Sequence, residues 1–390
     1  MPDNKKHHYV PVFYLKLFSP DEKSINLFNI KNEKAIYQVP LRNQCYRDYF
    51  YGNSGDEERA LGQIESIAAV SIKRMIDTTS IPKQSNYDYG NILIFLHVQS
   101  LRTAYQADAI NEMSDKFFKY ILSPQIEQEI PDIDLSKFRI DIMNAGNIGV
   151  YTALTSYTML IDMGWVLART EGGEFITCDT PVQFLNPFLG ESNGLSNAGI
   201  SAKGLIITYP LTPNLSLILF DREVYRLNRV TSTDQMAIAS SDDIDKLNVL
   251  QAANCYENFY YYSDDFDALS IYKRANKFRR TEKYRQRTFP QSKTDAERRE
   301  LIVTSQVGVN YPLDLSFLVI KKEAKRWLKE YLKQRFRPSI VERNPQLSSI
   351  HREYRELEKS GIQLPPILDF LKERLGQYQT ISPWQAKTST

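Results

Sequence analysis

The sequence predicts an α+β fold: a helical bundle portion packed with a small, mostly antiparallel sheet, followed by a helical C-terminal extension. Strand-like segments are grouped between residues 165 and 220, and helical patterns are grouped elsewhere. A doubly wound sheet would instead alternate strands and helices. Because the composition turns basic from Lys273 onward, we place a boundary near residue 275, between a core domain (1–275) and a basic linker with a helical region (276–390).

Apolar spacing predicts the elements of the first 160 residues. Residues 25–30 and 34–39 alternate apolar and polar side chains, which is typical of a hairpin. One helical face is predicted from side chains three and four residues apart, namely Leu61, Glu65, Ala68, Ile72 and Met75. Two more helices are expected over residues 88–119 and 138–161, although two glycines weaken the second.

Strand patterns follow, at residues 165–169, 174–178, 205–209 and 215–220. Glu171-Gly172-Gly173 suits a hairpin turn between the first two strands, and Thr212-Pro213-Asn214 suits one between the last two. The remaining elements are expected to be a helix over 241–258, an aromatic segment over 259–263, and C-terminal helices over 322–336, 350–357 and 367–375.

Composition and charge exclude several classes of protein. Hydrophobic residues make up 42% and charged residues 25%, which is ordinary for a soluble globular protein, and no apolar run approaches the roughly 20 residues of a membrane helix. The three cysteines form no Cys-x-x-Cys pair, so neither a disulfide framework nor a thiolate zinc site is expected. The N-terminus has no signal-like apolar stretch, so we expect a cytoplasmic protein.

The adjacent His7 and His8 open the first apolar segment. Neighbouring side chains of an extended segment point in opposite directions, so both would seldom bind one metal ion. We expect one to act as a ligand or general base while the other maintains local structure. The alternative is a disordered tail or the remnant of a tag, but the apolar stretch from Tyr9 to Phe18 argues against a tag.

Glu65, Gln99 and Arg102 occupy positions that the apolar pattern marks as buried. A buried carboxylate is unfavourable unless it is paired or bound to a cation. Arg102 would bind a carboxylate or a phosphate with two parallel hydrogen bonds. The structural alternative is an internal Arg102–Glu65 ion pair that holds two helices together. Glu58, on the same face as Leu61, is expected to be solvated in the first helical turn.

Asp179 follows a predicted strand and precedes Thr180-Pro181. Because Pro181 restrains Thr180 to an extended conformation, the carboxylate is presented at the strand end, where catalytic and metal-binding acids are common. The alternative, which we favour for the motif taken alone, is a turn in which the carboxylate only accepts hydrogen bonds from backbone amides.

Several segments together resemble a family of unknown function marked by an N-terminal His-His-Tyr-Val-Pro-x-Phe-Tyr-Leu motif, here His7–Leu15. Ile64-Glu65, Gln99–Thr103, Phe175–Val182 and the asparagine-bearing helix with Asn248 and Asn254 match the same family pattern. The chain departs from the pattern at Cys178, where serine is usual, and at Ala104, where proline often stands. The resemblance covers residues 5 to 265 and implies no established reaction. From the general character of the family, we expect a role in toxin activity or antiphage defence.

The candidate catalytic residues are His7, His8, Glu65, Gln99, Arg102 and Asp179. Imidazole, carboxylate and guanidinium groups suit phosphodiester hydrolysis. Glu65 and Asp179 would hold a divalent metal ion, Mg²⁺ or Mn²⁺, that activates water. Arg102 would stabilise the charge that develops on the phosphate. These residues predict a metal-dependent nuclease.

A basic segment predicts nucleic acid as the partner, with RNA preferred to DNA. Its cations are Lys273, Arg274, Lys277, Arg279, Arg280, Lys283, Arg285 and Arg287, against the single acid Glu282. Basic groups neutralise phosphates, and interleaved aromatic rings stack on exposed bases. The alternative is a solvated linker whose charges keep it soluble.

Two other functions stay open. The chain would be a non-catalytic RNA- or protein-binding module if its polar residues form a buried structural network and its C-terminal helices bind a partner or a second copy. Transfer or hydrolysis of a small molecule in an aromatic-lined pocket would suit the 24 Tyr and 19 Phe residues. No membrane partner is expected.

Overall fold

The computed structural model confirms the α+β class. It describes residues 5–53, 55–130, 133–190, 198–228, 230–231, 235–290, 300–334 and 341–377. The N-terminal elements are β1 (Lys6–His8), α1 (Val12–Lys16), β2 (Ser24–Asn29), β3 (Lys34–Pro40), a 3-10 helix η1 (Leu41–Asn43), β4 (Tyr46–Asp48), α2 (Asp56–Thr78), α3 (Tyr87–Leu101), α4 (Ala104–Glu129), η2 (Leu135–Lys137), α5 (Ala145–Ser156) and η3 (Tyr157–Leu160).

The second part of the chain supplies most of the strands and the C-terminal helices. Its elements are β5 (Gly164–Thr170), β6 (Thr177–Cys178), β7 (Gln183–Leu185), β8 (Ile206–Thr212), β9 (Leu215–Phe220), β10 (Tyr225–Leu227), β11 (Val230–Thr231), β12 (Met236–Ala239), α6 (Ser241–Asn254), β13 (Asn258–Tyr261), α7 (Ala268–Asn276), β14 (Tyr284–Pro290), β15 (Glu300–Gln306), β16 (Leu318–Ile320), α8 (Lys322–Lys333), α9 (Pro345–Lys359) and α10 (Ile367–Gln377). None of the described helices is both long and apolar enough to cross a membrane.

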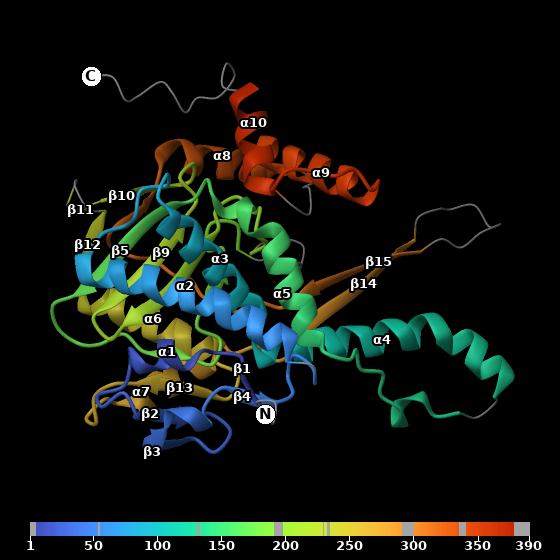
Figure 1. Cartoon of the computed structure of the whole chain (residues 1–390), viewed down its shortest axis with the longest axis horizontal. Helices are drawn as coiled ribbons and strands as arrows, with labels where there is room; N and C mark the ends of the chain where they lie inside the picture. The colour runs from blue at the N-terminus through green and yellow to red at the C-terminus, as the bar shows by residue number, and fades with distance from the viewer. Residues whose placement is uncertain are drawn as a thin grey trace.

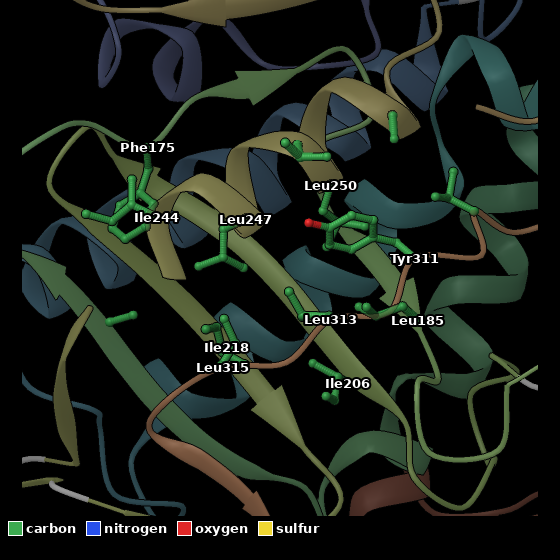
Figure 2. Close-up of a cluster of buried hydrophobic side chains, with 14 of the residues drawn as sticks. Phe175, Leu185, Ile206, Ile218, Ile244, Leu247, Leu250, Tyr311, Leu313 and Leu315 are labelled. Carbon is green, nitrogen blue, oxygen red and sulfur yellow. The ribbon is translucent and has the colours of Figure 1, made fainter. Parts of the chain in front are cut away.

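A six-stranded sheet with the order β11-β12-β5-β9-β8-β7 separates two apolar cores. It is antiparallel except where β12 pairs with β5. Every residue of β9 is buried, because successive side chains enter opposite cores. Ile218 packs in the core that contains Leu247 and Leu250 of α6, whereas Leu217 packs with the buried face of α2 and α3. Figure 2 shows the first of these cores, with Ile218 close to the α6 leucines.

A second sheet, with the order β3-β2-β13-β6, contains the predicted 25–39 hairpin. The predicted hairpin around Gly172 and Gly173 is wrong: β5 pairs with β9 and β12, whereas β6 pairs with β13. An α6 side chain replaces the expected strand partner, because Asn248 accepts from the Ile176 N–H at 2.9 Å and donates to the Glu174 carbonyl at 2.8 Å. A side chain 72 positions later in the sequence thereby supplies the hydrogen-bond partners of these backbone groups.

The predicted helix over residues 88–119 is two helices. α3 ends at Leu101, Arg102 has φ −96° and ψ 10°, and Thr103 is extended at ψ 158°. The Thr103 side chain then caps α4 by accepting from the Gln106 N–H at 3.4 Å. Arg102 therefore lies in the break between the two helices.

The helix predicted over residues 138–161 starts later in the structure than expected, because α5 begins only at Ala145. The preceding residues lie along α4: the N–H of Ile140 donates to Asp115, and the N–H of Ile142 donates to Asn111. These side chains satisfy backbone donors that a helix would otherwise use.

The region after residue 275 shares the core with the region before it. α7 spans the expected boundary, and Tyr311, Leu313 and Phe317 pack in the same core as α6. Figure 2 shows Leu313 and Leu315 close to Leu247. α9 and α10 pack on η3, where Arg343 forms a buried ion pair with Asp162 at 2.8 Å. The last residues of the helix expected over 322–336 lie outside the described residues.

Two elements leave the main body on the same side of the molecule. Figure 1 shows the teal helix α4 and the orange hairpin of β14 and β15 extending away from the sheets. They are joined at their bases, since the Tyr105 hydroxyl of α4 lies 3.3 Å from the Lys283 carbonyl and 3.4 Å from the Val307 carbonyl. The groups near Tyr105 are therefore held between the two elements.

We expect Gly149→Ala to destabilise the protein, because a Cβ at this position of α5 would lie 2.1 Å from the Leu101 carbonyl oxygen of α3. Overpacking of this kind costs about 1–3 kcal/mol in the free energy of unfolding, measured by urea denaturation. The matched control is Gly62→Ala in α2, where a Cβ meets nothing within 4 Å. This substitution should raise the free energy of unfolding by about 0.5–1 kcal/mol, because alanine favours the helix more than glycine does. A change of the same sign in the free energy of unfolding of both variants would contradict the close contact between α5 and α3.

Candidate functional site

The guanidinium of Arg102 is the centre of a polar group inside the protein. Arg102 is 0% exposed, its Nη1 donates to Glu65 Oε1 at 2.6 Å, and its Nε donates to Gln99 Oε1 at 2.9 Å. Burial alone would lower the pKa of Arg102, but Tyr51 and Glu65 outweigh it and raise the pKa. The internal ion pair foreseen as the structural alternative is therefore the arrangement that forms between α2 and the end of α3.

The same group holds the N-terminal motif. Gln99 Nε2 donates to the Tyr9 carbonyl at 3.0 Å, and the Tyr9 N–H donates to the Cys45 carbonyl at 2.8 Å. Since Gln99 also accepts from Arg102, one side chain connects the motif with the buried charge. Removing any of these contacts would leave a buried polar atom without a partner.

His7 and His8 lie in β1 and have different surroundings. His7 is buried, its Nδ1 accepts from the Tyr51 N–H at 3.2 Å, and its ring stacks on the Tyr51 ring with centroids 5.9 Å apart. His8 is half-buried, and burial lowers its pKa against the raising effects of the Arg42 backbone and Glu65. A lowered pKa keeps the His8 imidazole neutral at neutral pH.

Tyr51 and Glu58 belong to the same group, although no sequence pattern indicated Tyr51. Glu58, expected to be solvated, is half-buried. Burial raises its pKa, as does nearby Glu65, while His7 and Arg102 act in the opposite direction. Burial also raises the pKa of the Tyr51 hydroxyl, although Arg102 lowers it.

Within the described part of the chain, three buried polar atoms of this group lack a hydrogen bond of normal geometry, namely His8 Nε2, Tyr51 Oη and Arg102 Nη2, although Tyr51 Oη lies close enough to Arg102 for the guanidinium to lower its pKa. We refer to the whole group as the Arg102 cluster, consisting of His7, His8, Tyr51, Glu58, Glu65, Gln99 and Arg102. Buried polar atoms without partners are uncommon, so these three are available to a water molecule or a ligand.

Asp179 is held by a different part of the fold. Its carboxylate is 1% exposed and accepts from the backbone N–H groups of Tyr256, Glu257 and Asn258 at 2.7, 2.5 and 3.0 Å. Burial outweighs these three bonds and raises its pKa to about 6. The carboxylate thus joins β6 to the start of β13, and none of the described contacts links it to the Arg102 cluster.

The predicted metal ligands, Glu65 and Asp179, therefore have separate partners. Glu65 Oε1 is bound by Arg102, and both oxygens of Asp179 accept backbone hydrogen bonds. Over the described part of the chain, no three His, Cys, Asp or Glu side chains are grouped so that they could hold a metal ion. A metal ion at these two residues stays a prediction.

Several cations of the basic segment make contacts within the protein. Arg274 pairs with Asp245. Arg279 donates to the Ala252 carbonyl at 3.0 Å, and Arg280 donates to the Asn254 carbonyl at 2.7 Å. Cations at these last carbonyls of α6 stabilise the end of the helix. Lys273 and Lys277 are exposed, and the side chains of Arg285 and Arg287 lie outside the described residues.

A cleft of about 450 Å³ lies where this segment meets the start of α4. We call it the Arg280 cleft; its charged and aromatic lining residues are Tyr105, Glu112, Lys116, Tyr256, Arg279, Arg280, Glu282 and Lys283. The Arg280 guanidinium lies 3.8 Å from the Tyr105 ring centroid, and Lys283 Nζ lies 5.8 Å from that of Tyr256. Four cations face two acids here, so the local charge is positive.

Sequence patterns could not predict the contribution of the two tyrosines. Tyr105 and Tyr256 are 151 positions apart, and their rings meet edge to face with centroids 5.6 Å apart only after folding. Glu58 carried a usable signal, because it precedes Glu65 by two helical turns on one face of α2.

One comparison with known proteins finds a match. The model of a family described as "Protein of unknown function (DUF4238)" matches residues 6–265. No curated protein and no solved structure matches the chain.

We expect Arg102→Ala to lower the free energy of unfolding by about 3–5 kcal/mol, because it leaves Gln99 and Glu65 without their buried partner. The matched control is Arg59→Ala in α2, which removes an ion pair whose side chains are 66% and 74% exposed. The control should change stability by less than about 1 kcal/mol in the same chemical denaturation experiment. Equal losses in the two variants would contradict a structural role for the buried pair.

Proposed function

The chain belongs to the DUF4238 family, whose description assigns no reaction, so we propose from its own contacts that it binds nucleic acid, preferentially single-stranded RNA, at the Arg280 cleft. The observation that carries the proposal is the Arg280 guanidinium held 3.8 Å from the Tyr105 ring in a cleft of net positive charge. Phosphates are attracted by such cations, and the half-buried ring of Tyr256 in the same lining offers a surface for a base.

The balance of charge supports this location. The chain has 49 basic and 47 acidic residues, so its net charge of +2 does not attract polyanions by itself. The Arg280 cleft concentrates four cations, and two of them, Lys116 and Lys283, pair with Glu112 at 3.1 and 3.3 Å. A bound phosphate would replace Glu112 as their partner.

The surroundings of the cleft favour a strand without a complementary partner. Tyr256 lies half-buried in the lining, and its hydroxyl donates to Asp108 at 2.7 Å, which orients the ring. A base can stack on such a ring only when it is not already stacked inside a duplex. α4 and the β14–β15 hairpin both extend away from the main body beyond the cleft (Figure 1).

Cleavage of the bound nucleic acid is a second candidate function, favoured by the three unpartnered atoms of the Arg102 cluster. The neutral imidazole of His8 would act as the general base. Glu58, whose pKa is raised, would act as the general acid, and Arg102 Nη2 would stabilise the developing phosphate charge. A nucleic-acid hydrolase of this kind would suit a toxin or an antiphage defence protein.

We expect a Lys116→Gln/Lys283→Gln double variant to bind single-stranded RNA at least about tenfold more weakly at low salt, because two phosphate contacts are removed. The slope of log affinity against log salt should fall by about 1.4, as each single-strand contact contributes roughly 0.7. Fluorescence anisotropy with a labelled RNA measures both quantities.

The control for this experiment is Lys73→Gln/Lys359→Gln, which removes the same charge from exposed ion pairs on α2 and α9. This variant should retain the wild-type salt slope. An equal loss of affinity in both double variants would show that only net charge matters, and absence of RNA binding by the wild-type protein would refute the proposal.

For the second candidate, we expect folded protein to cleave RNA and His8→Gln to lower the rate by about 100-fold or more, since the general base is lost. The assay follows labelled RNA and DNA with Mg²⁺, with Mn²⁺ and with a chelator, because a metal ion stays a prediction. Tyr51→Phe tests the unpartnered hydroxyl, with the exposed Tyr37→Phe as its control. Cleavage that persists in His8→Gln, or no cleavage in any condition, would remove this candidate.

A further inference from the structure

A second cavity, of about 360 Å³, lies on the inner side of the Arg280 cleft. We call it the inner cavity. The end of α3, the start of α4, the end of α5 and residues 180–184 and 198–200 line it. It shares Tyr105 and Arg280 with the Arg280 cleft. Its volume lies within the roughly 300–1,000 Å³ that is typical of small-molecule sites.

The lining of the inner cavity is rich in uncharged polar groups. His97, Thr103, Gln183 and Asn254 line it and are each less than one-tenth exposed. Burial lowers the pKa of His97 to about 4, so its imidazole is neutral at physiological pH. Among the described residues that line the cavity there is no carboxylate, so none of these side chains repels an anion.

The hydrogen bonds around the cavity leave oxygen atoms for an occupant. Thr180 donates its hydroxyl to the Asn254 carbonyl at 3.0 Å, and Gln183 donates its amide nitrogen to the Thr180 carbonyl. Asn254 likewise donates its amide nitrogen, to Leu250. None of the described hydrogen bonds uses the side-chain oxygen of Gln183 or of Asn254, so these two oxygens can accept from the N–H groups on the edge of a base.

Arg280 lies at the junction of the two spaces. One of its five N–H donors is used by the Asn254 carbonyl, and Tyr105 supports one face of the guanidinium. A planar guanidinium with donors left over binds phosphate with two parallel hydrogen bonds. A ligand with a flat body that is polar at its edge and carries an adjoining phosphate matches a cavity with a largely apolar wall, several uncharged polar side chains and one cation at its edge.

We propose that the inner cavity binds the base of a nucleotide whose phosphate lies on Arg280. This inference rests on the proposed RNA binding and adds a site that takes one unstacked base out of the strand. Unpaired bases are commonly recognised in this way, by stacking and by hydrogen bonds to their edges. A free nucleotide offers the same chemistry, and the experiment below separates the two sources.

The test uses a substitution that adds a large side chain at the exposed part of the cavity wall without removing a polar group. Gly199 lines the inner cavity, and a Cβ built there meets nothing within 4 Å, so Gly199→Leu places a side chain in open space. The matched control is Gly172→Leu, where a Cβ also meets nothing within 4 Å but which does not line the cavity. Melting temperatures identify any loss of folding in either variant.

Calorimetry with each of the four nucleoside monophosphates, and anisotropy with single-stranded RNA, supply the readouts. We expect the wild-type protein and Gly172→Leu to bind at least one monophosphate, and Gly199→Leu to bind it at least about tenfold more weakly, since one recognised base contributes roughly 1–3 kcal/mol. Gln183→Met, which removes the amide at similar size, should also weaken this binding. A comparable loss of RNA affinity in Gly199→Leu would identify the ligand as a base within RNA.

The outcomes distinguish this inference from the proposed function. If RNA binding depends on Lys116 and Lys283 but Gly199→Leu binds both RNA and monophosphates as the wild type does, the inference is overturned and RNA binding at the cleft stands. If RNA does not bind but a monophosphate binds and Gly199→Leu abolishes it, the cavity is a site for free nucleotides and RNA binding is refuted. Failure of the wild-type protein to bind any monophosphate would overturn the inference.

Discussion

The guanidinium of Arg102 has no exposed surface, so the protein itself must supply every group that stabilises its charge. Glu65 supplies the countercharge from α2 and Gln99 supplies a carbonyl oxygen from α3. Because Gln99 also holds Tyr9, the position of the N-terminal segment depends on the same charge. Arg102 itself still donates its backbone N–H to the Val98 carbonyl at 3.0 Å, so the chain leaves the helix only after this side chain has been positioned.

Sequence patterns predicted the elements whose contacts are local. The hairpin of β8 and β9 and the helix α6 follow from apolar spacing and a turn, and each formed near its predicted residues. The break after Arg102 was not predictable, because no glycine or proline marks it in this sequence. The segment around Glu174 was wrongly assigned to a hairpin strand, because the side chain of Asn248, far along the chain in α6, binds its backbone in place of a neighbouring strand.

For the candidate site, too, sequence patterns predicted individual residues and local contacts, but not the contacts between distant segments. Glu65 and Arg102 were found because both interrupt apolar faces, and the ion-pair alternative described their contact. Asp179 was placed at a strand end, where the alternative of backbone hydrogen bonding matches its three partners. The basic segment was visible from composition, but only the fold separates Arg279 and Arg280, which cap α6, from exposed Lys273 and Lys277. The aromatic partners of these cations come from distant segments and carried no sequence signal.

Our proposal divides the molecule into a buried polar group that maintains the fold and a cationic cleft that binds RNA. The most direct test is to measure the unfolding free energy and the RNA dissociation constant of Glu65→Gln on one sample. Since Glu65 supplies the charge opposite Arg102 and is 25% exposed, stability should fall by about 1–3 kcal/mol while the RNA dissociation constant stays within about twofold of the wild type. Unchanged stability together with lost RNA binding would contradict this division and place recognition at the Arg102 cluster.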